Sequence, residues 1–322
     1  MKAVQLVGPQ QVAFLDVPIP KPKAGEVMVR MEYLALCGSD LRFYDRTLSA
    51  ERYPLKVGSP CHECVGTVEE STDPALPSGQ RVIAVTSQGA LVEYAAVSSD
   101  LLVPVPDGAK DPSLWVLCQP VGTVIYALQR LGSVYGKRVA VVGQGPIGLA
   151  FTDLLVRNGA REVYATDVND DRLAVARGLG AIHTINVNRE NPVERIAELT
   201  HGEMVDIGIE ACGLSSTYHQ VFSVLRKLGT VVIFGMPHVE DVFAFDWSMA
   251  YSKLPTILVT NSAAAGERVE YVSRCVDLVA EGRLDLSYLV SHRFSWSDIP
   301  QAFSMYSTRT DRSLKGIITV QC

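Results

Sequence analysis

A glycine-rich turn between a strand and a helix constrains the fold of this chain more than any other sequence feature. The apolar run Val139–Val142 leads into Gly143-Gln144-Gly145-Pro146-Ile147-Gly148, and an apolar helical stretch follows. The first glycine permits a tight turn, the second lets the backbone approach a pyrophosphate, and the third lets helix and strand pack closely. We therefore expect a βαβ unit whose dinucleotide contacts are Gly143, Gly145, Pro146, Ile147 and Gly148.

An acidic residue follows this turn at the position where a dinucleotide ribose would lie. Asp167 ends the next expected strand, where its carboxylate accepts hydrogen bonds from ribose hydroxyls and repels a 2'-phosphate, so NAD is favoured over NADP. Arg172 comes shortly after, and we expect it beside the adenosine. If the Arg172 side chain pointed inward instead, it would weaken the preference for NAD over NADP. A turn that merely joins strand and helix is the alternative, and Asp167 in register argues against it.

The hydrophobic pattern divides the chain into a β-rich first third and a region of alternating strands and helices. In the first third we expect strands at 26–31, 65–68, 81–85 and 91–94. From residue 137 onward we expect strands at 138–143, 162–167, 183–186, 205–211 and 230–235, with helices between them. This alternation predicts an α/β fold with a doubly wound parallel sheet. A helix at 267–280 precedes a last apolar run, 316–320, which we expect to pair with the first domain.

Length and composition restrict the class of protein. A chain of 322 residues predicts two domains, which we place at 1–117 with 263–322 and at 118–262. The net charge of -6 comes without a basic run, which argues against nucleic acid as a partner. No apolar stretch has the length to span a membrane, the N-terminus does not resemble a signal peptide, and seven scattered cysteines favour reduced thiols. We expect a cytoplasmic protein.

Two separate segments carry residues that bind metals well. Cys37-Gly38-Ser39-Asp40 follows one expected strand, and Cys61-His62-Glu63-Cys64 precedes another. Cysteine thiolate, histidine nitrogen and carboxylate oxygen are the usual zinc ligands. Either segment alone is ambiguous, because a single buried cysteine or histidine more often packs in a core.

Together with the glycine turn, these segments resemble the zinc-containing medium-chain dehydrogenase/reductase family, in its polyol, threonine and sugar dehydrogenase branch. The resemblance spans nearly the whole chain and rests on Gly25-Glu26-Val27, Cys37-Gly38-Ser39-Asp40, His62-Glu63, Val65-Gly66-Thr67-Val68, Gln119-Pro120, Gly143 to Gly148 and Leu228-Gly229-Thr230. It implies a GroES-like catalytic domain, a Rossmann domain that binds NAD, and hydride transfer between NAD and a secondary alcohol or its ketone. Family members are usually homodimers or homotetramers built through the nucleotide domain.

The resemblance also implies the metal ligands. Cys37 and His62 would bind one catalytic zinc ion, with Glu63 as a nearby or exchanging ligand and Asp40 fixing the tautomer of His62. Gln119 occupies a position where this branch usually has glutamate, and its carbonyl oxygen can still coordinate. The neighbouring Cys118 competes for this role, and the register with Pro120 favours Gln119.

Ser39 would act as the catalytic proton relay of the family, while a plain turn residue is the other interpretation of this serine. The metal would polarise the alcohol oxygen and lower its pKa. Relatives often place a histidine shortly after this motif as an outer relay. Here Leu41-Arg42 occupies that neighbourhood, and arginine cannot shuttle protons.

The cysteine pattern departs from the family in two places. Cys61 stands where glycine is usual, and the Cys61-x-x-Cys64 spacing allows a redox interpretation, which the strand predicted directly after it opposes. Between Gly79 and Tyr94 the chain has no cysteine and only a short connection, so the four-cysteine structural zinc lobe is missing. We expect one zinc ion per chain.

Two rival functions remain at this stage. A zinc-free NADPH quinone or enoyl reductase of the same superfamily would lack the ligands at 37 and 62, and Asp167 opposes it. A non-catalytic nucleotide-binding protein with a decayed metal site is favoured by Gln119, Cys61 and Arg42.

Overall fold

The computed structural model describes residues 1–45, 50–108, 110–237, 242–261, 265–308 and 313–320. These residues form two compact units, one of Met1–Thr123 with Ala263–Cys322 and one of Val124–Ser262. The boundary expected between 262 and 263 lies outside the described residues. No helix in the described ranges is both long and apolar enough to cross a membrane.

The first unit is built mainly on antiparallel strands. Its strands are β1 (Lys2–Gly8), β2 (Gln11–Asp16), β3 (Glu26–Ala35), β4 (Glu63–Glu70), β5 (Arg81–Ala84), β6 (Tyr94–Ser98), β7 (Leu102–Pro104), β14 (Val290–Ser295) and β15 (Lys315–Thr319). Of these, β14 pairs parallel with β15. Its helices are α1 (Leu41–Tyr44), the start of α2 (Cys118–Leu131), α9 (Arg268–Ala280) and α10 (Ile299–Thr308). Short 3-10 helices are η1 (Gly38–Asp40), η2 (Ala50–Arg52), η3 (Ser99–Leu101), η4 (Pro112–Leu117), η5 (Ser287–Leu289) and η6 (Trp296–Asp298).

Strand β3 is the centre of the main sheet in this unit. The described strands pair in the order β14-β15-β3-β4-β5-β7, and β6 also pairs with β3. The apolar side chains Val27, Val29 and Met31 alternate along β3 and are buried in the core, which is the pattern of a strand with one covered face. The last apolar run pairs antiparallel with β3 through β15, so the expectation that the C-terminal segment returns to the first domain is confirmed.

The strand expected at 91–94 is wrong, because it begins at Tyr94 and continues to Ser98. The backbone of Leu91 and Val92, just before this strand, pairs with several different segments. Leu91 N donates to Gly58 O at 3.0 Å, Leu91 O accepts from Val4 N at 2.9 Å, and Val92 forms a single bridge with Ala3. Partners on separate segments prevent a continuous ladder there.

The second unit is a parallel sheet covered by helices. Its strands are β8 (Arg138–Val142), β9 (Glu162–Asp167), β10 (His183–Asn186), β11 (Val205–Glu210), β12 (Leu225–Ile233) and β13 (Thr256–Val259). Its helices are the end of α2, α3 (Pro146–Arg157), α4 (Asp170–Gly178), α5 (Pro192–Leu199), α6 (Ser215–Ser223) and α7 (Trp247–Lys253). The strand order is β10-β9-β8-β11-β12-β13, the order of a doubly wound nucleotide-binding sheet, and the predicted fold class is confirmed.

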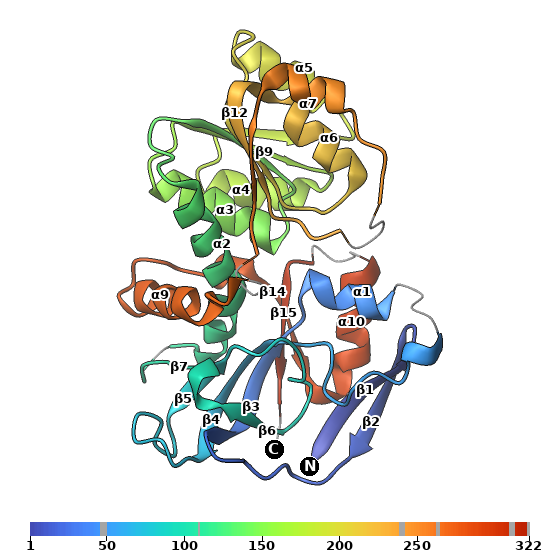
Figure 1. The fold of residues 1–322 in the computed structure, drawn as a ribbon, viewed down its shortest axis with the longest axis vertical. Coiled ribbons are helices and arrows are strands. Elements are labelled where there is room, and N and C mark those ends of the chain that lie inside the picture. Colours follow the sequence, from blue (N-terminus) through green and yellow to red (C-terminus); the bar gives the residue numbers. More distant parts are fainter. Residues whose placement is uncertain (46–49, 109, 238–241, 262–264, 309–312, 321–322) are drawn as a thin grey trace. The chain divides into compact units, whose positions relative to one another are not determined.

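Strand β8 lies in the middle of this sheet and is buried on both faces, as its unbroken valine and alanine run predicts. Helices α3 and α4 pack on one side of the sheet, and α6 and α7 pack on the other (Figure 1). Strands β9 and β10 follow on one side of β8, and β11, β12 and β13 follow on its other side. Ligands of such sheets bind outside the carboxyl ends of the strands where the order switches, here between β8 and β11.

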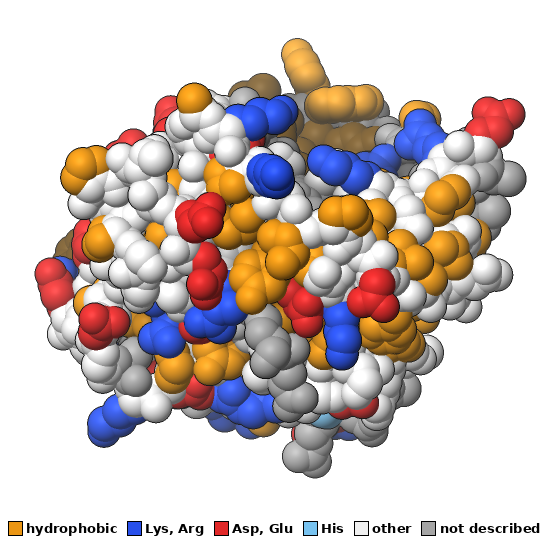
Figure 2. Space-filling view, turned by 90° about the horizontal axis from the view of Figure 1, so that it is seen from below, with side chains coloured by type: hydrophobic (Ala, Val, Ile, Leu, Met, Phe, Trp, Pro, Cys, Tyr) orange, Lys and Arg blue, Asp and Glu red, His pale blue; other side chains and the backbone are white. Residues whose placement is uncertain are grey.

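Charged side chains of both signs are interspersed on the face shown in Figure 2, with hydrophobic side chains between them. Neither sign covers this face as a whole.

Candidate functional site

The candidate metal ligands meet where β3 ends and β4 begins. These strands pair antiparallel with Ala35 opposite Glu63, so Cys37, just after β3, lies beside His62, just before β4. One donor atom each of Cys37, His62 and Glu63 lie within 4.8 Å of one another. Glu63 is fully buried, whereas the other two are partly exposed. A thiol, an imidazole and a carboxylate this close together suit a zinc ion.

Asp40 orients the imidazole and the segment that carries Cys37. Its side chain is 1% exposed, with Oδ1 3.2 Å from His62 Nδ1 and Oδ2 accepting from Cys37 N at 2.9 Å. Burial lowers the pKa of His62, but the hydrogen bonds with Asp40 and Cys37 outweigh it and raise that pKa well above its usual value. Because Nδ1 is engaged by Asp40, Nε2 is the ring nitrogen available to a metal.

Lys315 is a member of this site that the sequence analysis missed. Its Nζ lies 2.6 Å from both Oε1 and Oε2 of Glu63 and donates to Leu36 O at 2.9 Å. Burial lowers the pKa of Lys315, but the charge of Glu63 more than offsets this effect and raises it above its usual value. The only sequence signal is a lysine in an otherwise apolar segment, at the start of β15.

Three further predicted residues lie in the same unit. Ser39 lies in η1, which begins directly after Cys37, and its side chain is half-buried. Gln119 is buried in the first turn of α2, and its side chain makes no hydrogen bond to any residue that the structure describes. Cys118 is fully buried, and its thiol interacts with Cys275 of α9.

The two cysteines of the Cys-x-x-Cys segment have separate packing roles. Cys61 Sγ donates to Ala35 O at 3.4 Å, and Cys64 Sγ donates to Ala84 O at 3.3 Å. Both thiols are fully buried, and β4 runs from Glu63 to Glu70, so it includes the strand predicted at 65–68. Burial raises the pKa of both thiols, whereas a redox pair of the thioredoxin type has a thiol with a lowered pKa.

The glycine turn of the second unit leaves space where a pyrophosphate would lie. Gly143 has φ +92°, and a Cβ on Gly148 would lie 1.8 Å from Gly143 O, so both positions require glycine. A Cβ on Gly145 would meet nothing within 4 Å. Gly145 precedes α3, which begins with Pro146 and Ile147 and whose first turn receives no side-chain cap. Open space at an uncapped helix N-terminus suits a phosphate group.

Asp167 lies against this turn at the carboxyl end of β9. Its Oδ2 accepts from Gln144 N at 2.6 Å and its Oδ1 accepts from Asn169 N at 2.9 Å. The side chain is 8% exposed, which leaves an edge for a further hydrogen bond. Arg172 lies in the first turn of α4 and is partly exposed. Cys212, to which the sequence analysis gave no role, packs on the turn, because a Cβ on Gly143 would lie 2.2 Å from its Sγ.

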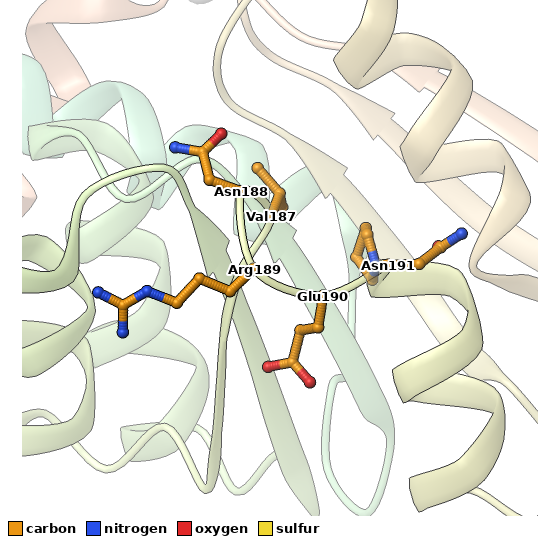
Figure 3. Close-up of a pocket in the computed structure, with 6 residues that line it drawn as sticks. Val187, Asn188, Arg189, Glu190 and Asn191 are labelled. Carbon is orange, nitrogen blue, oxygen red and sulfur yellow. The ribbon is translucent and has the colours of Figure 1, made fainter.

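A shallow hollow of about 470 Å³ is lined by Val187–Pro192, the turn after β10 (Figure 3). It lies beside the backbone of Asp167, since Val187 N donates to Asp167 O at 3.1 Å. The long side chains of Arg189 and Glu190 extend away from each other, and Arg189 pairs with Asp170. None of the predicted site residues lines this hollow.

Comparisons with known proteins match both units. Residues 23–107 match the family described as alcohol dehydrogenase GroES-like domain, and residues 146–280 match the one described as zinc-binding dehydrogenase. The chain is 30% identical to L-threonine 3-dehydrogenase of Anaeromyxobacter dehalogenans over 94% of this chain and 93% of that protein. It is 29% identical to an alcohol dehydrogenase of Cupriavidus necator over 98% and 97% of the two chains. An alcohol dehydrogenase structure from Thermus sp. ATN1 superposes with a TM-score of 0.88 at 26% identity, covering 100% of both chains.

Proposed function

We propose that this chain, which belongs to the zinc-type medium-chain alcohol dehydrogenase family, transfers a hydride between a secondary alcohol and NAD. The observation that carries the proposal is the convergence of donor atoms from Cys37, His62 and Glu63 within 4.8 Å. A zinc-free reductase would not need these three side chains together. Polyols, sugars, cyclitols and related alcohols form the proposed substrate class.

In this proposal Cys37, His62 and Gln119 bind one zinc ion, and Glu63 is a nearby or exchanging ligand. When bound, the metal would supply Lewis acidity toward the alcohol oxygen. Asp40 keeps the His62 ring in the tautomer that binds through Nε2, since it engages Nδ1 at 3.2 Å. Ser39 would relay the alcohol proton, accepting it as its own hydroxyl proton is passed on, and Arg42, in α1, takes no part as an outer proton relay.

NAD is assigned to the second unit. Gly145 gives the pyrophosphate room at the start of α3, and the carboxylate of Asp167 accepts hydrogen bonds from the adenosine ribose. We propose that Arg172 lies beside the adenosine. We assign the metal to the domain of residues 1–117 with 263–322 and the dinucleotide to residues 118–262.

We also propose a homo-oligomer built through β13. This strand is the outermost in its sheet, and it exposes Ile257 and Val259. The neighbouring helix α7 exposes Trp247 and Tyr251. An apolar edge strand can pair antiparallel with its own copy about a two-fold axis, because the same surface then serves both chains.

A turnover screen with matched variants tests the enzyme proposal. Purified protein is analysed for zinc and assayed with secondary alcohols and with ketones, using NAD and NADP in parallel. We expect one zinc ion per chain and NAD-linked turnover, both lost in Cys37→Ser. Well-folded protein without zinc or hydride transfer would instead support a nucleotide-binding protein, and zinc-free turnover of a quinone with NADPH would support a reductase.

The variant Gly145→Ala tests the NAD site separately. The backbone at Gly145 has φ -66°, which alanine adopts readily, and its Cβ would enter open space, so the fold should persist. We expect the dissociation constant of NAD to rise by about tenfold or more, near 1.4 kcal/mol. Unchanged NAD affinity would show that the turn only joins β8 to α3.

A further inference from the structure

Lys315 is a buried cation with every donor engaged. It begins β15 and is 2% exposed. An ammonium group has three hydrogens to donate, and Nζ has three acceptors: Leu36 O at 2.9 Å and both carboxylate oxygens of Glu63 at 2.6 Å. Burial of an ammonium group costs free energy, and these contacts offset that cost.

The partners of Lys315 belong to the two segments that carry the candidate metal ligands. Leu36 directly precedes Cys37, and Glu63 directly follows His62. One ammonium group therefore links the end of β3 to the start of β4. Its position is set by β15, which pairs with β3 through Ile317 opposite Ala35.

Because both oxygens of Glu63 bind Lys315, a metal beside Cys37 would have to compete with an ammonium group for this carboxylate. We propose that Lys315 is a positioning residue that withholds Glu63 from the metal, so that zinc is bound by Cys37, His62 and Gln119 while Lys315 is present. This inference rests on the proposed zinc site. Catalytic zinc sites keep one coordination position open, and a withheld carboxylate leaves more of the positive charge of the metal uncompensated.

The first test compares Lys315→Met, Lys315→Arg and the double variant K315M/E63Q as zinc-loaded protein. Zinc release to a chromogenic chelator is followed over time at constant pH. In Lys315→Met, Glu63 loses the ammonium group that binds both of its oxygens and becomes a ligand, so we expect release at least about tenfold slower than in the wild type. Lys315→Arg keeps the charge and should release zinc at the wild-type rate, as should the double variant, which lacks both members of the pair.

Cobalt substitution gives a spectroscopic signature of the same change. We expect the visible bands of the cobalt-loaded protein to shift in Lys315→Met and to remain at their wild-type positions in the double variant. Release from folded Lys315→Met that is as fast as in the wild type, or faster, would overturn the inference.

A second variant decides the question if the loss of Lys315 prevents folding. Glu63→Gln keeps Lys315 and the shape of the side chain. If Glu63 is withheld from the metal, this variant should keep the wild-type cobalt spectrum and a zinc release rate within about threefold of the wild type. A shifted spectrum with release accelerated about tenfold or more would show that Glu63 is already a ligand and would refute the inference. Wild-type protein that binds no zinc would refute the proposed function instead.

Discussion

The neighbouring side chains Cys118 and Gln119 differ in what surrounds them. The thiol of Cys118 interacts with Cys275, where helices α2 and α9 approach so closely that a Cβ on Gly122 would lie 2.9 Å from Tyr271 O. Gln119 is 8% exposed, and its amide has no hydrogen bond within the described ranges. The amide oxygen of Gln119 is therefore available to coordinate a metal.

This difference predicts opposite results for two adjacent substitutions. Gln119→Ala removes the proposed oxygen ligand, so the zinc affinity should fall by more than about tenfold. Cys118→Ser changes a thiol that faces α9 and should leave the zinc affinity unchanged. Competition titrations against a chelator of known affinity measure both. Zinc loss in Cys118→Ser with normal binding in Gln119→Ala would assign the ligand to Cys118.

Residue spacing predicted some members of the site and could not predict others. Cys37, His62 and Glu63 lie at the ends of two consecutive strands, so their motifs are visible in the sequence, and the structure brings their donor atoms together. The roles of Cys37 and His62 as ligands stay a prediction, and Glu63 is the residue that we propose Lys315 withholds from the metal. Lys315 contacts Glu63 across 252 positions, a separation at which no local pattern relates two residues.

At the scale of elements, the strands with the clearest apolar runs were predicted well. Strands β9 and β10 have the predicted bounds, 162–167 and 183–186. Strand β12 was expected at 230–235 but runs from Leu225 to Ile233, because its first residue pairs with Val205 of β11 before the register shifts. Such shifts depend on the partner strand, as does the late start of β6, and a single sequence does not show them.

A partly buried ionic contact ties three strands of the first unit together. Glu32 of β3 accepts hydrogen bonds from Thr67 of β4 at 2.6 Å and from Arg81 of β5 at 2.8 Å. Burial raises the pKa of Glu32, but these hydrogen bonds and the charges of Arg81 and Arg30 outweigh it, and the net effect lowers the pKa. The ionised carboxylate is therefore favoured in the folded protein.

This contact predicts how stability depends on pH. Because the folded pKa of Glu32 is lowered, its stabilising effect is present above its unfolded pKa of about 4.3 and is lost as the pH falls through the folded value. Glu32→Gln should reduce the free energy of unfolding at pH 7 by about 1–3 kcal/mol. Urea unfolding at pH 7 and at pH 3.5 should show a smaller difference between variant and wild type at the lower pH. An equal difference at both values would contradict the assignment.

At the scale of the whole molecule, the two ends of the chain belong to the same unit. The C-terminal strand β15 pairs with β3, while residues 124–262 form a separate sheet. The apolar run at the C-terminus and the rhythm of alternating strands and helices were enough to predict this arrangement. The predicted dinucleotide and metal residues are thereby divided between the units, with Gly143 to Gly148 and Asp167 in one and Cys37 and His62 in the other.

The exposed edge of the second sheet gives a prediction for assembly. Val259 on β13 is 63% exposed, and Ile182, next to the opposite edge strand β10, is 62% exposed. In a dimer paired through β13, Val259→Lys places like charges at the shared edge and should shift the protein toward monomer, whereas Ile182→Lys should not. Both exposed substitutions should leave the free energy of unfolding within about 0.5 kcal/mol unless assembly stabilises the fold. Light scattering coupled to size-exclusion chromatography measures the mass of each variant. A monomeric wild type, or dissociation caused by Ile182→Lys alone, would rule out β13 as the interface.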